Sequence, residues 1–66
     1  MPFVSVKALE GFLSTEEKQR LIKEITDSVV AIKGEVVRDG TWVTVEDVPS
    51  GAWGIGGKIL EKKVAR

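Results

Sequence analysis

The stretch that decides the fold is STEEKQRLIKEITDSVVAIKG, residues 14–34. Its apolar side chains recur at spacings of one, three, four and three residues, at Leu21, Ile22, Ile25, Val29 and Ile32. This is the period of an amphipathic α-helix. Ser14 and Glu17 have the spacing of a capping box, and Gly34 is a typical residue just beyond a helix end. The sequence therefore predicts a helix over residues 15–33.

A predicted strand lies on each side of this helix. In FVSVKA, residues 3–8, apolar side chains alternate between two faces, with Phe3 on one and Val4 on the other. TWVTVEDV, residues 41–48, is rich in the β-branched and aromatic residues that favour strands. A helix that joins two strands of one sheet is a crossover. We therefore expect the strands to be parallel and the crossover right-handed.

The carboxyl-terminal third is glycine-rich. SGAWGIGGK, residues 50–58, carries four glycines around its tryptophan and favours a turn or a tight hairpin over a helix. The final stretch, ILEKKVAR at 59–66, is compatible with a short strand, a helical turn or a frayed end. The predicted fold class is α/β, with one domain over 1–66 that combines a β-α-β unit, a two-stranded parallel sheet and a carboxyl-terminal hairpin.

Size and topology both predict an obligate oligomer. A chain of 66 residues buries a small core, and without cysteine it has no disulfide to stabilise it. One helix covers one face of a two-stranded sheet, whereas parallel sheets are normally buried on both faces. The hydrophobic content of 42% is also high for a chain with so little interior. We expect a second copy to cover the bare face.

Composition argues against several partners. Ten basic residues balance ten acidic ones, so no basic surface for nucleic acid is expected. No apolar run reaches the roughly 20 residues that span a membrane, and no signal peptide precedes the first strand, so we expect a cytoplasmic protein. Without histidine or cysteine there is no Ser/His/Asp or Cys/His set, and the acidic residues are scattered. We expect neither a metal nor another cofactor.

Three residues are candidates for chemistry, each with a structural alternative. Pro2 can simply begin a strand, since a sheet tolerates proline there. If Met1 is removed, however, Pro2 carries a secondary amine that can act as a base. Trp53 is either an interface anchor or a wall of a ligand pocket. Arg38 follows the predicted helix and stands beside a turn. It is either a solvated loop residue or a residue that contacts substrate.

The order of four motifs resembles the 4-oxalocrotonate tautomerase family over nearly the whole chain. The motifs are Pro2, LEG at 9–11, the helix start EEK…LI, and WGIGG at 53–57. The resemblance implies a β-α-β subunit that forms dimers, usually three of them in a homohexamer, with heterohexamers also occurring. It further implies that the processed proline is a general base. This base moves a proton between the enol oxygen and a carbon of a keto acid.

The chain departs from the family at two positions. Phe12 follows the LEG stretch and Trp42 begins the second strand, where the well-studied family members carry arginines that bind substrate carboxylates and polarise the carbonyl. Trp53 corresponds to the family aromatic that packs on substrate. The predicted site therefore has Pro2 as base and Phe12, Trp42 and Trp53 as apolar walls. Arg38 is a possible replacement for the missing cations.

The leading hypothesis is an isomerase that interconverts the enol and keto forms of a small 2-oxo acid or a related compound. The alternative is a catalytically silent or partner-dependent subunit that serves as an oligomeric scaffold or a ligand-binding protein.

Overall fold

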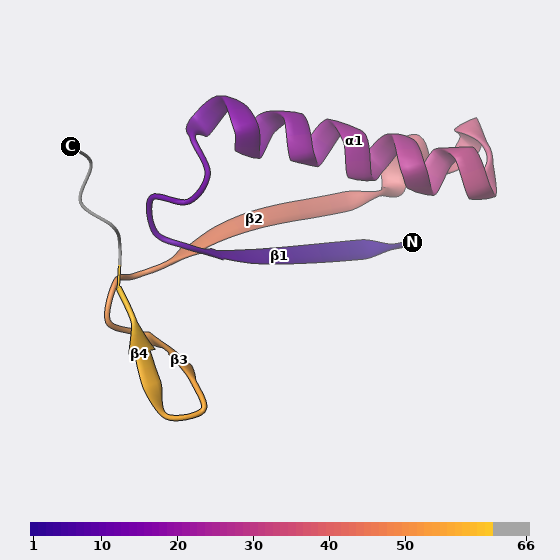
Figure 1. Ribbon diagram of the computed structural model, residues 1–66. Coiled ribbons are helices and arrows are strands. Elements are labelled where there is room, and N and C mark those ends of the chain that lie inside the picture. The colour runs from indigo at the N-terminus through magenta and orange to yellow at the C-terminus, as the bar shows by residue number, and fades with distance from the viewer. Residues whose placement is uncertain (62–66) are drawn as a thin grey trace.

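The computed structural model describes residues 1–61 and has the predicted β-α-β order (Figure 1). Its elements are β1 (Phe3–Leu9), α1 (Thr15–Lys33), the 3₁₀ helix η1 (Glu35–Gly40), β2 (Trp42–Val48), β3 (Trp53–Ile55) and β4 (Lys58–Leu60). Strands β1 and β2 pair in parallel, and β3 and β4 form a separate antiparallel hairpin. The predicted fold class and the two parallel strands are confirmed.

The bounds of α1 follow from its caps. The backbone N–H of Glu17 donates to Ser14 Oγ at 3.1 Å, and the Ser14 N–H donates to Glu17 Oε1 at 2.9 Å, which completes the capping box. At the other end Gly34 adopts φ of 101°, a conformation that favours glycine, and its N–H donates to the carbonyl of Val30. The helix therefore stops after Lys33, as predicted.

The small core lies between α1 and the sheet. The register pairs Phe3 with Trp42 at one end and Leu9 with Val48 at the other. Along β1 the even-numbered side chains are more buried than the odd-numbered ones, in line with the predicted alternation. Within residues 1–61 only two hydrophobic residues are buried, Ala8 in β1 and Val30 in α1, and both keep a small exposed fraction.

The opposite face of the sheet is open. The rings of Phe3 and Trp42 meet edge to face on it, yet these residues remain 65% and 62% exposed. Farther along the same face Lys7 and Glu46 form an exposed ion pair at 3.1 Å. The bare sheet face that the topology predicts is therefore present, with an apolar end at Phe3 and Trp42.

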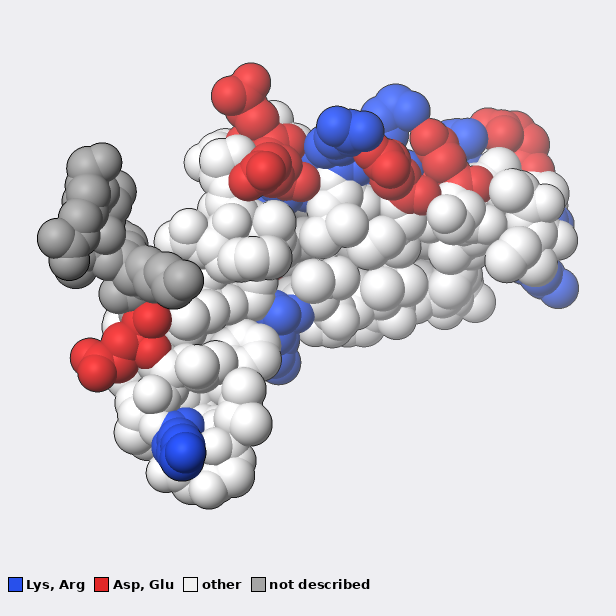
Figure 2. Space-filling view, in the orientation of Figure 1, with Lys and Arg blue, Asp and Glu red and all other residues white. Residues whose placement is uncertain are grey.

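Charged side chains gather elsewhere. Figure 2 shows basic and acidic groups interspersed along the outer surface of α1, above a broad surface that is largely uncharged. Several of these groups pair along the helix, among them Arg20 with Glu24 and Lys23 with Asp27. No helix in the described part of the chain is long and apolar enough to cross a membrane.

The structure adds detail to the two least regular segments. Residues 35–40, expected as a connector, form η1, and the Thr41 hydroxyl donates to the carbonyl of Val37 at 2.7 Å just beyond it. Of the alternatives for the final stretch, the short strand is present as β4, while residues 62–66 lie outside the described residues. The β3–β4 hairpin lies at the end of the molecule opposite the amino terminus (Figure 1).

Candidate active site

Pro2 stands immediately before β1 and is held there by its carbonyl oxygen. The backbone N–H of Trp42 donates to this oxygen at 3.0 Å. Pro2 has no N–H to donate, so its place at the mouth of the strand leaves no backbone donor unpaired. The structural role of Pro2 is thus real, and it leaves the ring free to face a pocket.

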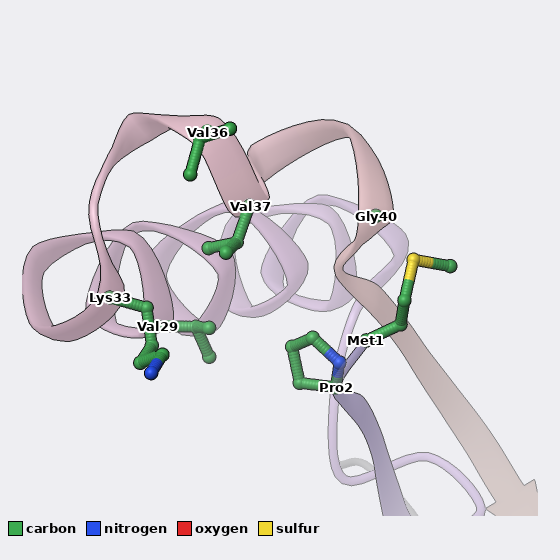
Figure 3. A pocket seen from close by; sticks show the side chains of 7 residues that line it. All are labelled: Met1, Pro2, Val29, Lys33, Val36, Val37 and Gly40. Carbon is green, nitrogen blue, oxygen red and sulfur yellow. The ribbon is translucent and has the colours of Figure 1, made fainter.

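The pocket beside Pro2 has a volume of about 440 Å³, which is within the usual range for small-molecule sites. The end of α1, the 3₁₀ helix η1 and the amino terminus enclose it (Figure 3). Its lining is Met1, Pro2, Val29, Lys33, Val36, Val37 and Gly40. The lining is mostly apolar, and Lys33 contributes its one charged side chain.

Met1 lies at the edge of this pocket, against Gly40 (Figure 3). A Cβ added to Gly40 would come within 2.6 Å of the Met1 sulfur, so the absence of a side chain there permits the close approach. While Met1 is attached, the nitrogen of Pro2 belongs to a tertiary amide and is not basic. Removal of Met1 would both create the amine and open the pocket edge.

Two of the predicted wall residues lie far from this pocket. Phe12 is 75% exposed in the turn after β1, where its N–H donates to the carbonyl of Leu9 at 3.0 Å. The length of β1, roughly 23 Å from Pro2 to Leu9 at 3.3 Å per residue, separates Phe12 from Pro2. Trp53 lies in the hairpin at the same distant end. A single chain does not bring these side chains to Pro2.

Trp42 is close to Pro2 only through its backbone. Its ring stacks edge to face on Phe3 at a centroid distance of 6.4 Å, on the open sheet face. It does not belong to the lining of the pocket beside Pro2. Trp42 could line that pocket only if another chain extended the pocket around the edge of the sheet to the open face.

Arg38 binds two carboxylates and is also absent from the pocket lining. Its guanidinium donates from Nε to Glu35 Oε1 at 2.5 Å and from Nη1 to Asp27 Oδ1 at 2.9 Å. Hydrogen bonds from Lys23 and then from Arg38 lower the pKa of Asp27, and the bond from Arg38 lowers the pKa of Glu35. Both carboxylates in turn raise the pKa of Arg38. This cluster connects η1 to α1 and so supports a pocket wall.

The pocket lining includes Lys33, Val36 and Val37, none of which was predicted from the sequence as a site residue. Val29 and Lys33 are four residues apart and therefore share a helix face, a signal that was present in the sequence. The valines reach the pocket because Gly34 turns the chain into η1. The sequence showed no periodicity that would have placed them there.

Comparisons with known proteins agree with this fold. The family model described as "Tautomerase enzyme" matches residues 2–63. A curated relative, probable tautomerase K2 of Dickeya dadantii (strain 3937), is 30% identical over 63 residues, which cover 96% of this chain and 92% of the relative.

Solved structures give the same result. A 4-oxalocrotonate tautomerase isozyme from Methylibium petroleiphilum is 32% identical with a TM-score of 0.74, over 85% of this chain and 87% of the isozyme. DmpI from Helicobacter pylori is 28% identical with a TM-score of 0.75, over 88% of each chain. Fold and sequence together define an isomerase of the 4-oxalocrotonate tautomerase type. The chain belongs to the tautomerase family.

Proposed function

We propose that the chain interconverts the enol and keto forms of a small 2-oxo acid, with the amine of Pro2 as the general base after Met1 is removed. One observation carries the proposal: the ring of Pro2 faces an apolar pocket while its carbonyl is fixed by the Trp42 N–H. A base must be held within hydrogen-bond reach of the proton that it takes. A rigid ring anchored through its own carbonyl holds the nitrogen of Pro2 at a fixed place beside the pocket.

The proposed reaction is a proton transfer between two atoms of the substrate. The Pro2 amine takes the hydroxyl proton of the enol, the carbonyl forms as the C=C electrons shift, and the resulting ammonium returns a proton to carbon. No electrons are gained or lost overall, so no oxidant or reductant is needed. An apolar pocket disfavours the charged ammonium form of an amine, which favours the return of the proton to the substrate carbon.

An oligomer supports this function by completing the site. In the folded subunit, Phe12 and Trp53 lie at the end of the molecule opposite Pro2. If two copies associate in opposite directions through their open sheet faces, this end of one copy lies beside Pro2 of the other. The resemblance favours a homohexamer built from three dimers. A heterohexamer would place the side chains of a different subunit there.

The second candidate function is that of a silent or partner-dependent subunit. It is favoured by the apolar Phe12 and Trp42, at the positions where the resemblance implies substrate-binding arginines, and by the two carboxylates on Arg38. This reading predicts a folded oligomer that binds ligands in the pocket but turns none over alone.

Two measurements separate the two functions. Intact mass of the natively expressed protein shows whether Met1 is removed. The processed protein is then assayed for ketonisation of 2-hydroxymuconate and of enol-phenylpyruvate, alongside Pro2→Ala and the control Pro49→Ala, which changes a proline beyond β2. We expect Pro2→Ala to lower kcat, with partial activity because a primary amine remains, and Pro49→Ala to retain it. An active protein unaffected by Pro2→Ala would refute the role of Pro2.

A further inference from the structure

A carboxylate in the Pro2 pocket needs a cationic partner, and the expected partners do not supply one. Phe12 and Trp42 are apolar at the two positions where the resemblance implies substrate-binding arginines. Arg38 is bound to Asp27 and Glu35. A carboxylate that enters an apolar pocket without a partner loses hydration and gains nothing in return. Another cation must therefore meet the substrate if the substrate is an acid.

Lys33 is that cation by position. It lies in the last turn of α1 and lines the pocket together with Val29, which is one helical turn away (Figure 3). Within residues 1–61 it forms no ion pair, whereas Lys7, Lys18 and Lys23 each bind a carboxylate. Its ammonium is thus available to a ligand.

A lysine in the last turn of a helix also has a purely structural explanation. It can complement the partial negative charge at the helix end. That role needs only a cation near the carboxyl terminus of α1, and it predicts no effect on ligands. The two roles therefore differ in what they predict for binding, and the binding of a charged and a neutral ligand separates them.

We infer that Lys33 binds the carboxylate of the substrate and that the substrate is a monocarboxylate with an apolar remainder. The carboxylate accepts hydrogen bonds from the Lys33 ammonium, while the remainder contacts Val36 and Val37 beside the ring of Pro2. Lys33 is the one charged side chain that this chain contributes to the lining, so a second carboxylate would have no cationic side chain of the same chain to pair with. This inference rests on the proposed function for the site, and it deepens it by naming the substrate class.

The test measures binding, so it does not depend on turnover. The affinities of the oligomer for trans-cinnamate and for cinnamamide, which has the same shape without the charge, are measured by calorimetry. The variants are Lys33→Gln, Lys33→Arg as the charge-conserving form, and Lys58→Gln as the matched control. Lys58 also lacks an ion pair within the described residues, but it lies in the distant hairpin.

Cinnamate should bind the unmodified protein more tightly than cinnamamide does, and Lys33→Gln should weaken cinnamate about tenfold. This is the lower end for a charge-assisted hydrogen bond, because Lys33 is exposed and its charge is screened by solvent. The affinity of Lys33→Gln for cinnamamide should equal that of the unmodified protein. Lys33→Arg and Lys58→Gln should keep the affinity for cinnamate.

The inference is overturned if cinnamate does not bind the unmodified protein, or if it binds no better than cinnamamide. It is equally overturned if Lys33→Gln weakens both ligands alike or if Lys58→Gln has the same effect as Lys33→Gln. A protein that binds cinnamate through Lys33 but does not catalyse ketonisation would refute the proposed function and leave Lys33 as the residue that binds a carboxylate ligand. If turnover is insensitive to Pro2→Ala while binding still depends on Lys33, Pro2 is not the base, but Lys33 still binds the carboxylate.

Discussion

The backbone N–H of Trp42 donates to the carbonyl of Pro2 at 3.0 Å, while the Trp42 ring lies on the open face of the sheet against Phe3. Trp42 thus anchors the proposed base through its main chain. Because only the backbone is involved, the side chain at position 42 can change without releasing Pro2. Its ring is available for association instead.

This arrangement predicts that no stable folded monomer exists at micromolar concentration. Ala8 and Val30 are the only buried hydrophobic residues among residues 1–61, while Phe3 and Trp42 are mostly exposed on the sheet. So small a core does not offset the conformational entropy that folding costs. Sedimentation should show a species larger than 7.2 kDa that unfolds as it dissociates on dilution. A folded monomer of that mass would contradict the prediction.

Restoring the two arginines should improve turnover of a dicarboxylate. Phe12→Arg with Trp42→Arg adds two cations at positions that are exposed in the single chain. A charge-assisted contact contributes about 1.5–3 kcal/mol, so two could raise kcat/KM for 2-hydroxymuconate by roughly two orders of magnitude. Phe3→Arg is the matched control, because it adds a cation beside Trp42 on the same face.

This account of the pocket would be wrong if the unmodified homo-oligomer already turned over 2-hydroxymuconate with a kcat/KM of about 10⁶ M⁻¹s⁻¹ or higher, near the upper part of the usual enzyme range. The added arginines would then bring no gain.

Arg38→Ala should weaken the support of η1 more than it weakens the recognition of an anion. The guanidinium joins Glu35 in η1 to Asp27 in α1, so its loss should lower Tm slightly and weaken cinnamate and cinnamamide alike. Arg20→Ala is the control, because it removes an exposed arginine that pairs within α1. If Arg38→Ala selectively weakened the acid, Arg38 would be a substrate-binding residue.

Stability should fall in acid through the same cluster. Hydrogen bonds from Lys23 and then Arg38 lower the pKa of Asp27, and the bond from Arg38 lowers the pKa of Glu35. Carboxyls with lowered pKa values in the folded state stabilise it above their ordinary range near pH 4. This contribution is lost as the pH falls through the lowered values.

Thermal unfolding between pH 6 and about pH 2 measures this loss, with pH 2 well below the ordinary carboxyl range. Protein concentration must be held fixed, because Tm of an oligomer depends on it. Asp27→Asn should reduce the slope of Tm against pH. An unchanged slope would show that the cluster adds nothing to stability in this range.

The elements were predictable because their signals are local. The capping box of Ser14 and Glu17, the glycine at position 34 and the alternation in β1 all act within a few residues. The fold class followed from their order. The pocket was less predictable because Lys33 and Val37 meet only after the chain turns into η1.

The predicted wall residues show a second limit of the sequence. In the folded subunit, Phe12 and Trp53 lie at the opposite end of the molecule from Pro2, so one copy alone does not place them beside Pro2. Only contacts between copies can do so, and contacts of that kind leave no local pattern in a single sequence. The resemblance to a family suggested these residues together. The fold of one chain separates them.

The central claim is that the free amine of Pro2 is the base, and a chain this short can be made by chemical synthesis with and without Met1. The two chains, residues 2–66 and residues 1–66, are refolded at the same concentration and assayed for ketonisation of enol-phenylpyruvate. General base catalysis contributes typically 10²–10⁴-fold, so the chain with Met1 should be slower by about 10²-fold or more. Equal rates for the two chains would contradict the account.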